Sequence, residues 1–173
     1  MKPWINYAKV VPAGYKAVRG LEDYVKKCGL EPSLLELVRL RASQINGCAY
    51  CIDMHTKDAR SEGESEQRLY GISAWWETPF YSEREQAALA WTEAVTKISE
   101  NQIPDAVYEQ ASSNFNEKEL VDLTLAVIAI NSWNRLAISF HTPPGSYHPE
   151  HQVTIGKTSE NKEPSKKFKY NGG

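Results

Sequence analysis

Cysteine and histidine are scarce in this sequence of 173 residues, which contains three cysteines and four histidines. A small, odd and clustered set of cysteines argues against the disulfide framework of a small secreted domain. Basic residues do not outnumber acidic ones, and the formal net charge is −2. The composition therefore gives no sign of a nucleic-acid partner or of a charged membrane surface as a partner.

Long apolar runs are also missing, although a bilayer-spanning helix needs about 20 consecutive apolar residues. The best candidate is residues 120–140, and four polar residues interrupt it: Asp122, Asn131, Asn134 and Arg135. The N-terminal stretch MKPWINYAKVVPAGYKAV lacks the apolar segment and small-residue cleavage site of a signal peptide. We therefore expect a cytoplasmic protein with no membrane partner.

Alternating segments rich in β-branched residues are nearly absent, whereas apolar residues recur at helical spacing along most of the chain. Ser82 with Glu85 and Asn116 with Glu119 have the spacing of helix capping boxes, and Pro32 suits a first helical turn. The predicted helices are 14–28, 32–45, 48–61, 65–75, 82–99, 104–112 and 116–140. The sequence thus predicts an all-α fold, with the most apolar helix, 116–140, at its centre.

The composition changes after Phe140. The stretch HTPPGSYHPEHQ is rich in turn-forming residues, and the remainder is polar and rich in lysine. We expect a single core domain over residues 1–140, followed by a C-terminal extension over residues 141–173. This extension is predicted to be partly flexible or packed on a neighbouring subunit.

Two of the three cysteines lie in one short segment, GCAYCIDMHTKDAR, which is residues 47–60. On a helix, Cys48 and Cys51 share a face, and His55 continues the same stripe because it is four residues beyond Cys51. Cys48 falls at the predicted helix start, where free backbone N–H groups favour a thiolate. The pKa of a histidine lies near neutrality, so His55 can stabilise a thiolate or transfer a proton.

Three interpretations of this segment compete. A zinc site normally has four ligands, and Cys28 and the other histidines lie far away in the sequence. Buried cysteines can also act simply as small apolar side chains in a core. The spacing of the three reactive side chains favours the remaining interpretation, a redox-active dithiol, over both alternatives.

The longer stretch ELVRLRASQINGCAYCIDMHTKDAR resembles the core motif of the carboxymuconolactone decarboxylase superfamily, in its alkylhydroperoxidase D-like (AhpD-like) branch. That motif places a Glu twelve residues before a Cys-x-x-Cys and a His four residues after it, which Glu36, Cys48, Cys51 and His55 match. The later stretch INSWNRLAIS also resembles the family. The similarity covers residues 32–140, which is most of the predicted core.

This resemblance implies an AhpD-like helical bundle that assembles as a homo-oligomer, as a trimer or a hexamer. It implies a thiol-dependent peroxidase that reduces organic hydroperoxides and needs no cofactor or metal. In that scheme Cys51 is the peroxidatic thiol, Cys48 the resolving thiol, and Glu36 with His55 the proton relay. The reductant that the resemblance implies is a dithiol on a lipoylated or thioredoxin-like partner protein.

Two details of this expected site depend on its surroundings. The best-studied family pattern has a second His directly before the second Cys, where this chain has Tyr50, which cannot supply a near-neutral base. In a partly apolar pocket the pKa of Glu36 would rise, which would make it a usable base near neutrality. Arg39, Arg41 and Arg135 are candidates for ion pairs, and Arg135 needs a partner if its helix is buried.

Two other functions stay open. A lactone-decarboxylating enzyme of the same superfamily would use polar residues other than the cysteine pair. A non-enzymatic assembly protein could use Cys48, Cys51 and His55 to bind zinc. The thiol content after peroxide treatment separates these alternatives from a peroxidase.

Overall fold

The regular structure is helical throughout the part of the chain that the structure describes, residues 2–149 of a computed structural model. The helices are α1 (Tyr7–Val10), α2 (Pro12–Val25), α3 (Pro32–Asn46), α4 (Ala49–Ser61), α5 (Glu66–Gly71), the 3₁₀ helix η1 (Ile72–Glu77), α6 (Glu83–Thr96), α7 (Asp105–Asn114) and α8 (Glu117–Ser139). The all-α prediction is confirmed. Within residues 2–149 no helix has the length and apolar character needed to cross a membrane.

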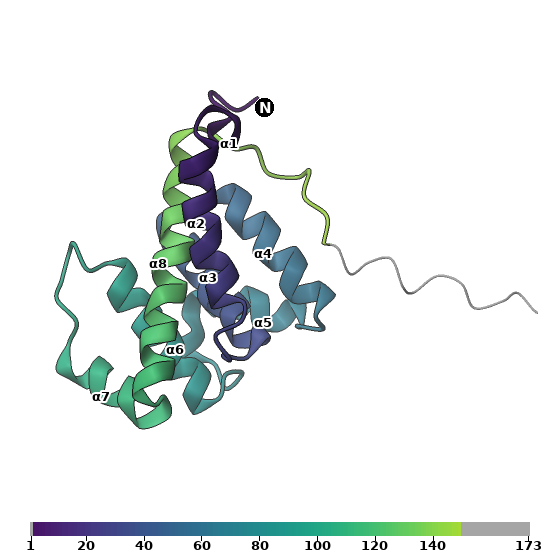
Figure 1. Cartoon of the computed structure of the whole chain (residues 1–173). Coiled ribbons are helices and arrows are strands. Elements are labelled where there is room, and N and C mark those ends of the chain that lie inside the picture. The colour runs from purple at the N-terminus through teal and green to yellow at the C-terminus, as the bar shows by residue number, and fades with distance from the viewer. Residues whose placement is uncertain (1, 150–173) are drawn as a thin grey trace, which may run out of the picture.

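Helix α3 is the most enclosed element, because α4, α6 and α8 pack around it. Figure 1 shows α2 lying along α8, with α4 to one side of them and α6 and α7 toward the other. Nine of the fifteen residues of α3 are therefore buried, including the polar residues Glu36, Arg39 and Ser43. Since an unpaired polar group in a core is costly, each of these three must find a partner inside the bundle.

Helix α8 lies at the centre of the bundle, as predicted, and shares that place with α3. It packs against α2, α3 and α6, and its buried face includes Leu123, Val127 and Ile130. Its other side leaves Val121 and Ile128 exposed. Both predicted capping boxes are present, at the start of α6 and at the start of α8.

Several predicted helices differ from those in the structure, and the one predicted over residues 82–99 ends at Thr96. Helix α2 begins at Pro12, whose fixed φ suits a first turn, and it ends at Val25 before the left-handed Gly29. The short helix α1 has no buried residue and gave no periodic signal. The segment predicted as one helix over residues 65–75 is divided into α5 and η1, which contains the non-helical Ala74.

A tight turn separates α3 from α4. Gly47 ends α3 in the left-handed conformation, with φ 70°, and Cys48 then caps the N-terminus of α4. Only glycine adopts this conformation without steric cost, so the helix break predicted at this position has a backbone cause. The turn leaves α3 and α4 packed side by side.

The chain after α8 turns back toward α4, as Figure 1 shows for the yellow-green segment. The Gly145 backbone N–H donates to Asp53 Oδ2 over 2.9 Å, and Lys57 Nζ donates to the Tyr147 carbonyl over 3.1 Å. The start of the predicted C-terminal extension, up to residue 149, thus packs on its own subunit's α4. The predicted flexible remainder, 150–173, lies outside the described residues, and packing on a neighbouring subunit stays a prediction.

Candidate active site

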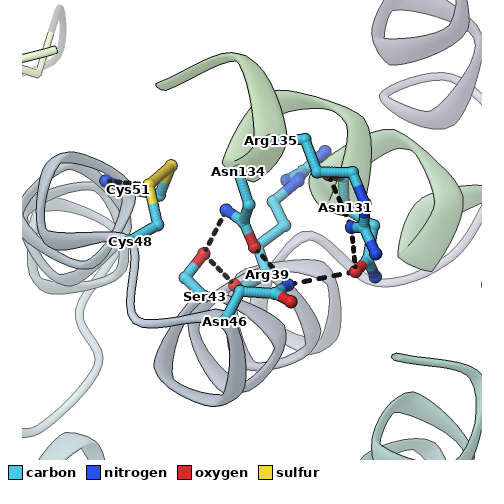
Figure 2. Close-up of a disulfide and its surroundings, with 8 residues drawn as sticks. All are labelled: Arg39, Ser43, Asn46, Cys48, Cys51, Asn131, Asn134 and Arg135. Atoms are coloured by element: carbon cyan, nitrogen blue, oxygen red, sulfur yellow. Dashed lines mark hydrogen bonds between the residues drawn. A yellow bond between two sulfur atoms is a disulfide. The ribbon is translucent and has the colours of Figure 1, made fainter. Parts of the chain in front are cut away.

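Cys48 and Cys51 are joined in a disulfide at the start of α4, with 5.3 Å between their Cα atoms (Figure 2). The two positions are three apart in the sequence, so one turn of chain brings the sulfurs together. Each cysteine is only 1% exposed, and Ala42, Ile130 and Ala137 surround them. The pair is therefore a buried disulfide between two positions that one helical turn already brings close together.

The N-terminus of α4 provides a hydrogen bond to the sulfur of the capping residue. Cys48 is the N-cap, and its Sγ accepts from the Cys51 backbone N–H over 3.3 Å. Free N–H groups and the helix dipole lower the pKa of a thiol at such a position. Burial among apolar side chains acts in the opposite direction, since it disfavours a thiolate.

His55 and Glu36 form a buried pair between α4 and α3. The Nδ1 of His55 lies 2.8 Å from Glu36 Oε2, and the two residues are 5% and 7% exposed. His55 is one turn beyond Cys51 on the face of α4 that meets α3. The structure therefore brings the Glu and His of the motif into contact, although they are 19 positions apart.

The carboxylate of Glu36 also receives a guanidinium. Arg39 NH1 donates to Glu36 Oε1 over 2.6 Å, and Arg39 NH2 donates to Glu22 Oε1 over 2.7 Å. Burial raises the pKa of Glu36, but the hydrogen bonds and positive charges of His55 and Arg39 outweigh it, so the pKa lies below its ordinary value. The expectation of a raised pKa was wrong, because the pocket is ionic rather than apolar.

This charge state determines the proton positions on His55. An ionised Glu36 can only accept hydrogen bonds, so Nδ1 of His55 must carry the proton that is donated to it. In neutral His55 the free lone pair is then on Nε2. That atom is buried and has no hydrogen-bond partner within the described residues. In neutral His55, Nε2 is thus the ring nitrogen that can accept a proton, while the Nδ1–H donates to the Glu36 carboxylate.

The other two arginine candidates are placed differently. Arg41 Nε pairs with Glu93 Oε1 over 2.8 Å, away from Glu36. Arg135 is exposed and donates to Asn131 Oδ1 over 2.8 Å rather than to an acidic residue. The expected need for an ion-pair partner was wrong for Arg135, because its side of α8 faces solvent.

A ladder of amides fastens the turn before Cys48 to α8 (Figure 2). Asn46 Nδ2 donates to Asn134 Oδ1 over 2.8 Å and to Asn131 Oδ1 over 3.0 Å. Asn134 Nδ2 in turn donates to Ser43 Oγ over 3.0 Å, so Asn134 both accepts from and donates to α3. These bonds fix the end of α3, and with it the position at which the disulfide begins.

Aromatic rings from four helices lie near one another on the disulfide side of the bundle. Tyr50 and Trp133 pack against the buried cluster that contains both cysteines. Tyr15 contacts Trp133 at 5.5 Å between ring centroids, and Tyr7 lies 6.3 Å from Tyr15. Burial raises the pKa of Tyr50, so its phenol stays protonated at neutral pH and supplies no base.

Metal binding in this region would involve a different set of residues from the expected one. Glu36, His55 and Asp58 each place one ligand atom within 4.8 Å of the others, whereas the two sulfurs are bonded to each other. A disulfide offers no thiolate to zinc. The guanidinium of Arg39 at 2.6 Å from Glu36 also disfavours a second cation beside that carboxylate.

Sequence reasoning missed three residues that contact this arrangement. Asp58 lies three residues after His55, so helical spacing alone could have identified it. Glu22 on α2 and Tyr147 after α8 left no such signal, because only the packing of distant segments brings them to α3 and α4. The roles assigned to Glu36 and the two cysteines stay predictions.

Comparison with known proteins agrees with this geometry. The family described as carboxymuconolactone decarboxylase matches residues 12–94, a range that contains the Glu, both cysteines and the His of the site. The uncharacterised protein YdfG of Bacillus subtilis is 43% identical over 139 residues, which cover 80% of this chain and 95% of YdfG.

Solved structures share the fold. A protein of unknown function from Agrobacterium tumefaciens, described as a putative antioxidant defence protein AhpD, is 49% identical with a TM-score of 0.79, over 86% of this chain and 99% of that one. An AhpD-core, peroxidase-related protein from Ralstonia eutropha has a TM-score of 0.70 at 19% identity, over 80% of this chain and 74% of that one. The chain therefore belongs to the carboxymuconolactone decarboxylase family, in its AhpD-like branch.

Proposed function

We propose that this protein is a thiol-dependent peroxidase that reduces organic hydroperoxides. The observation that carries the proposal is that Cys51, in a buried disulfide with Cys48, is one turn before the buried His55 on α4, and that His55 in turn contacts Glu36 on the adjacent α3. The similarity to the Agrobacterium protein described as a putative antioxidant defence protein supports it.

The oxidative half of the reaction uses both cysteines. His55 Nε2 takes the proton of the Cys51 thiol, and the thiolate attacks the hydroperoxide O–O bond. Cys51 becomes a sulfenic acid, and the leaving alkoxide takes the proton from His55 to become an alcohol. The Cys48 thiol then attacks the Cys51 sulfur, and the hydroxide that leaves takes the thiol proton to form water. Two thiols are thus oxidised to one disulfide for each peroxide reduced.

The reductive half requires an outside dithiol. Thiol–disulfide exchange transfers two electrons to the Cys48–Cys51 disulfide and leaves the disulfide on the donor. A lipoylated or thioredoxin-like protein is the donor class that we propose. Since each cysteine is 1% exposed, the donor can reach the disulfide only after the covering rings, Tyr50 among them, move aside.

The test is a thiol titration of the reduced protein before and after one equivalent of cumene hydroperoxide, followed by mass mapping of the disulfide. We expect two thiols to be lost and a Cys48–Cys51 peptide to appear, and Cys51→Ser to abolish peroxide consumption. An unchanged thiol count would contradict the proposal. Retained turnover of a carboxymuconolactone in Cys48→Ser and Cys51→Ser variants would instead favour a decarboxylase.

A further inference from the structure

The segment after α8 is attached to α4 next to the proposed site. Besides the contacts of Gly145 and Lys57, the Tyr147 hydroxyl donates to Asp58 Oδ1 over 2.6 Å. Lys57 also forms an ion pair with Asp53 over 2.9 Å, so the two side chains that contact Gly145 and Tyr147 contact each other as well. The proposed reaction scheme uses none of these residues.

Asp58 faces the buried pair. It is one turn beyond His55 on α4, and its carboxylate lies within 4.8 Å of ligand atoms of both His55 and Glu36. Asp58 is half-buried, whereas the other two are buried. A single imidazole thus lies near two carboxylates, of which only the inner one is paired with a guanidinium.

The two carboxylates differ in their surroundings. The charged and titratable groups around Asp58 are Glu36, His55, Tyr147 and, at the end of α2, Lys26. Burial raises the pKa of Asp58, the Tyr147 hydrogen bond opposes that rise, and the negative charge of Glu36 adds to it. The pKa of Glu36 shifts the other way, so the inner carboxylate is a fixed anion and the outer one is more easily protonated.

We propose that Asp58, held by the Tyr147 hydroxyl, is a positioning residue that sets the proton affinity of His55, so that the chain after α8 completes the site. The catalytic role of this effect rests on the proposed function. A nearby carboxylate favours imidazolium over imidazole, which is the form that His55 adopts when Nε2 takes the thiol proton. Tyr147 contributes by stabilising the ionised form of Asp58.

The first measurement needs no activity. In the oxidised full-length protein, NMR of the imidazole nitrogens gives the pH midpoint of His55, with His141 as an internal reference. Asp58→Asn removes the outer carboxylate and should lower this midpoint by about one pH unit, which is tenfold weaker proton binding. Tyr147→Phe should lower it less. In the double variant, Tyr147→Phe should add nothing, because its effect acts through Asp58.

The second measurement is the pH dependence of thiol oxidation by cumene hydroperoxide in the reduced protein. Because His55 must be neutral to accept the thiol proton, the acidic limb of the rate profile should shift to lower pH in Asp58→Asn, in parallel with the NMR midpoint. Tyr70→Phe removes a comparable tyrosine–carboxylate bond, to Glu66 over 2.8 Å on exposed α5, and should change neither measurement.

The outcomes separate the two proposals. An NMR midpoint that is the same in wild type and Asp58→Asn overturns this inference, as does a Tyr147→Phe effect of equal size with and without Asp58. A wild-type protein that loses no thiols to peroxide refutes the proposed function. The NMR result still shows whether Asp58 affects the proton affinity of His55. Tyr147→Phe, which keeps every charge, provides the answer if Asp58→Asn does not fold.

Discussion

The Nδ1 of His55 lies 2.8 Å from Glu36 Oε2, and this contact joins two helices that meet across a single left-handed residue, Gly47. Because Nδ1 donates in this contact, Nε2 is the nitrogen that carries no proton in the neutral imidazole. Because the pKa of Glu36 is lowered, its carboxylate is ionised near neutrality and accepts the Nδ1–H of His55. Five predictions follow from the surroundings of this pair.

Glu36→Gln should slow thiol oxidation by peroxide by about 100-fold, the lower end of what a general base contributes. The amide can donate to Nδ1, which permits the tautomer of His55 that carries its proton on Nε2. The substitution also removes the negative charge that pairs with the Arg39 guanidinium. Stopped-flow thiol loss measures the rate. Glu31→Gln, which alters the exposed N-cap glutamate of α3 that pairs with Arg84 of α6, should keep the wild-type rate. A full rate in Glu36→Gln would contradict the assigned role.

The stability of the oxidised protein should fall in acid, partly through Glu36. A carboxyl whose folded pKa is lowered contributes stability that is present above its unfolded pKa, about 4.3, and is lost as the pH falls through the lower folded value. Breaking a buried pair costs about 3–5 kcal/mol, so Glu36→Gln should be less stable than wild type at pH 7. Urea unfolding should show this difference narrowing toward pH 3. A difference that is constant with pH would refute the linkage.

Gly47→Ala should destabilise the protein by about 1–2 kcal/mol, because an alanine in the left-handed region brings Cβ too close to the following carbonyl. Open space surrounds the position, so strain of the backbone is the only cost. Gly20→Ala in α2 also meets open space but has ordinary helical geometry, and it should stabilise by about 0.5–1 kcal/mol. Thermal unfolding of both variants checks the opposite signs.

Asn134→Ala should destabilise the protein by about 1–3 kcal/mol, because it leaves the buried Ser43 hydroxyl and the Asn46 amide short of a partner. It should also slow disulfide formation after peroxide treatment, since the turn before Cys48 is no longer fastened to α8. Urea unfolding and mass mapping measure the two effects. Asn101→Ala, at an exposed position, is the control. Equal stability of the two variants would contradict a stabilising role for the hydrogen bonds of Asn134 to Ser43 and Asn46.

Tyr50→Ala should accelerate reduction of the Cys48–Cys51 disulfide by a protein dithiol more than by dithiothreitol. The ring packs against the buried cluster that contains both sulfurs, so its removal matters most for a bulky donor. Thiol release followed over time with reduced thioredoxin and with dithiothreitol gives the ratio. Tyr108→Ala, on the exposed surface of α7, should leave that ratio unchanged. An unchanged ratio in Tyr50→Ala would show that the ring is not the barrier.

Local chemistry in the sequence determined the helices and one row of reactive groups. Capping pairs such as Asn116 with Glu119 act within a single turn, and the break at Gly47 is a property of one residue's backbone. Cys48, Cys51 and His55 share a helix face because of spacing alone. Such features depend on neighbours in the chain, and they could therefore be predicted before any packing was known.

Only the tertiary structure decided the electrostatics of the site. The sequence suggested a raised pKa for Glu36, but Arg39 and His55 reverse its direction, and Arg39 is itself balanced by Glu22 from α2. Tyr147 reaches Asp58 from 89 positions away. Proton affinity in a core depends on burial and on every charge within a few ångströms, and packing brings those charges together from segments far apart in the chain.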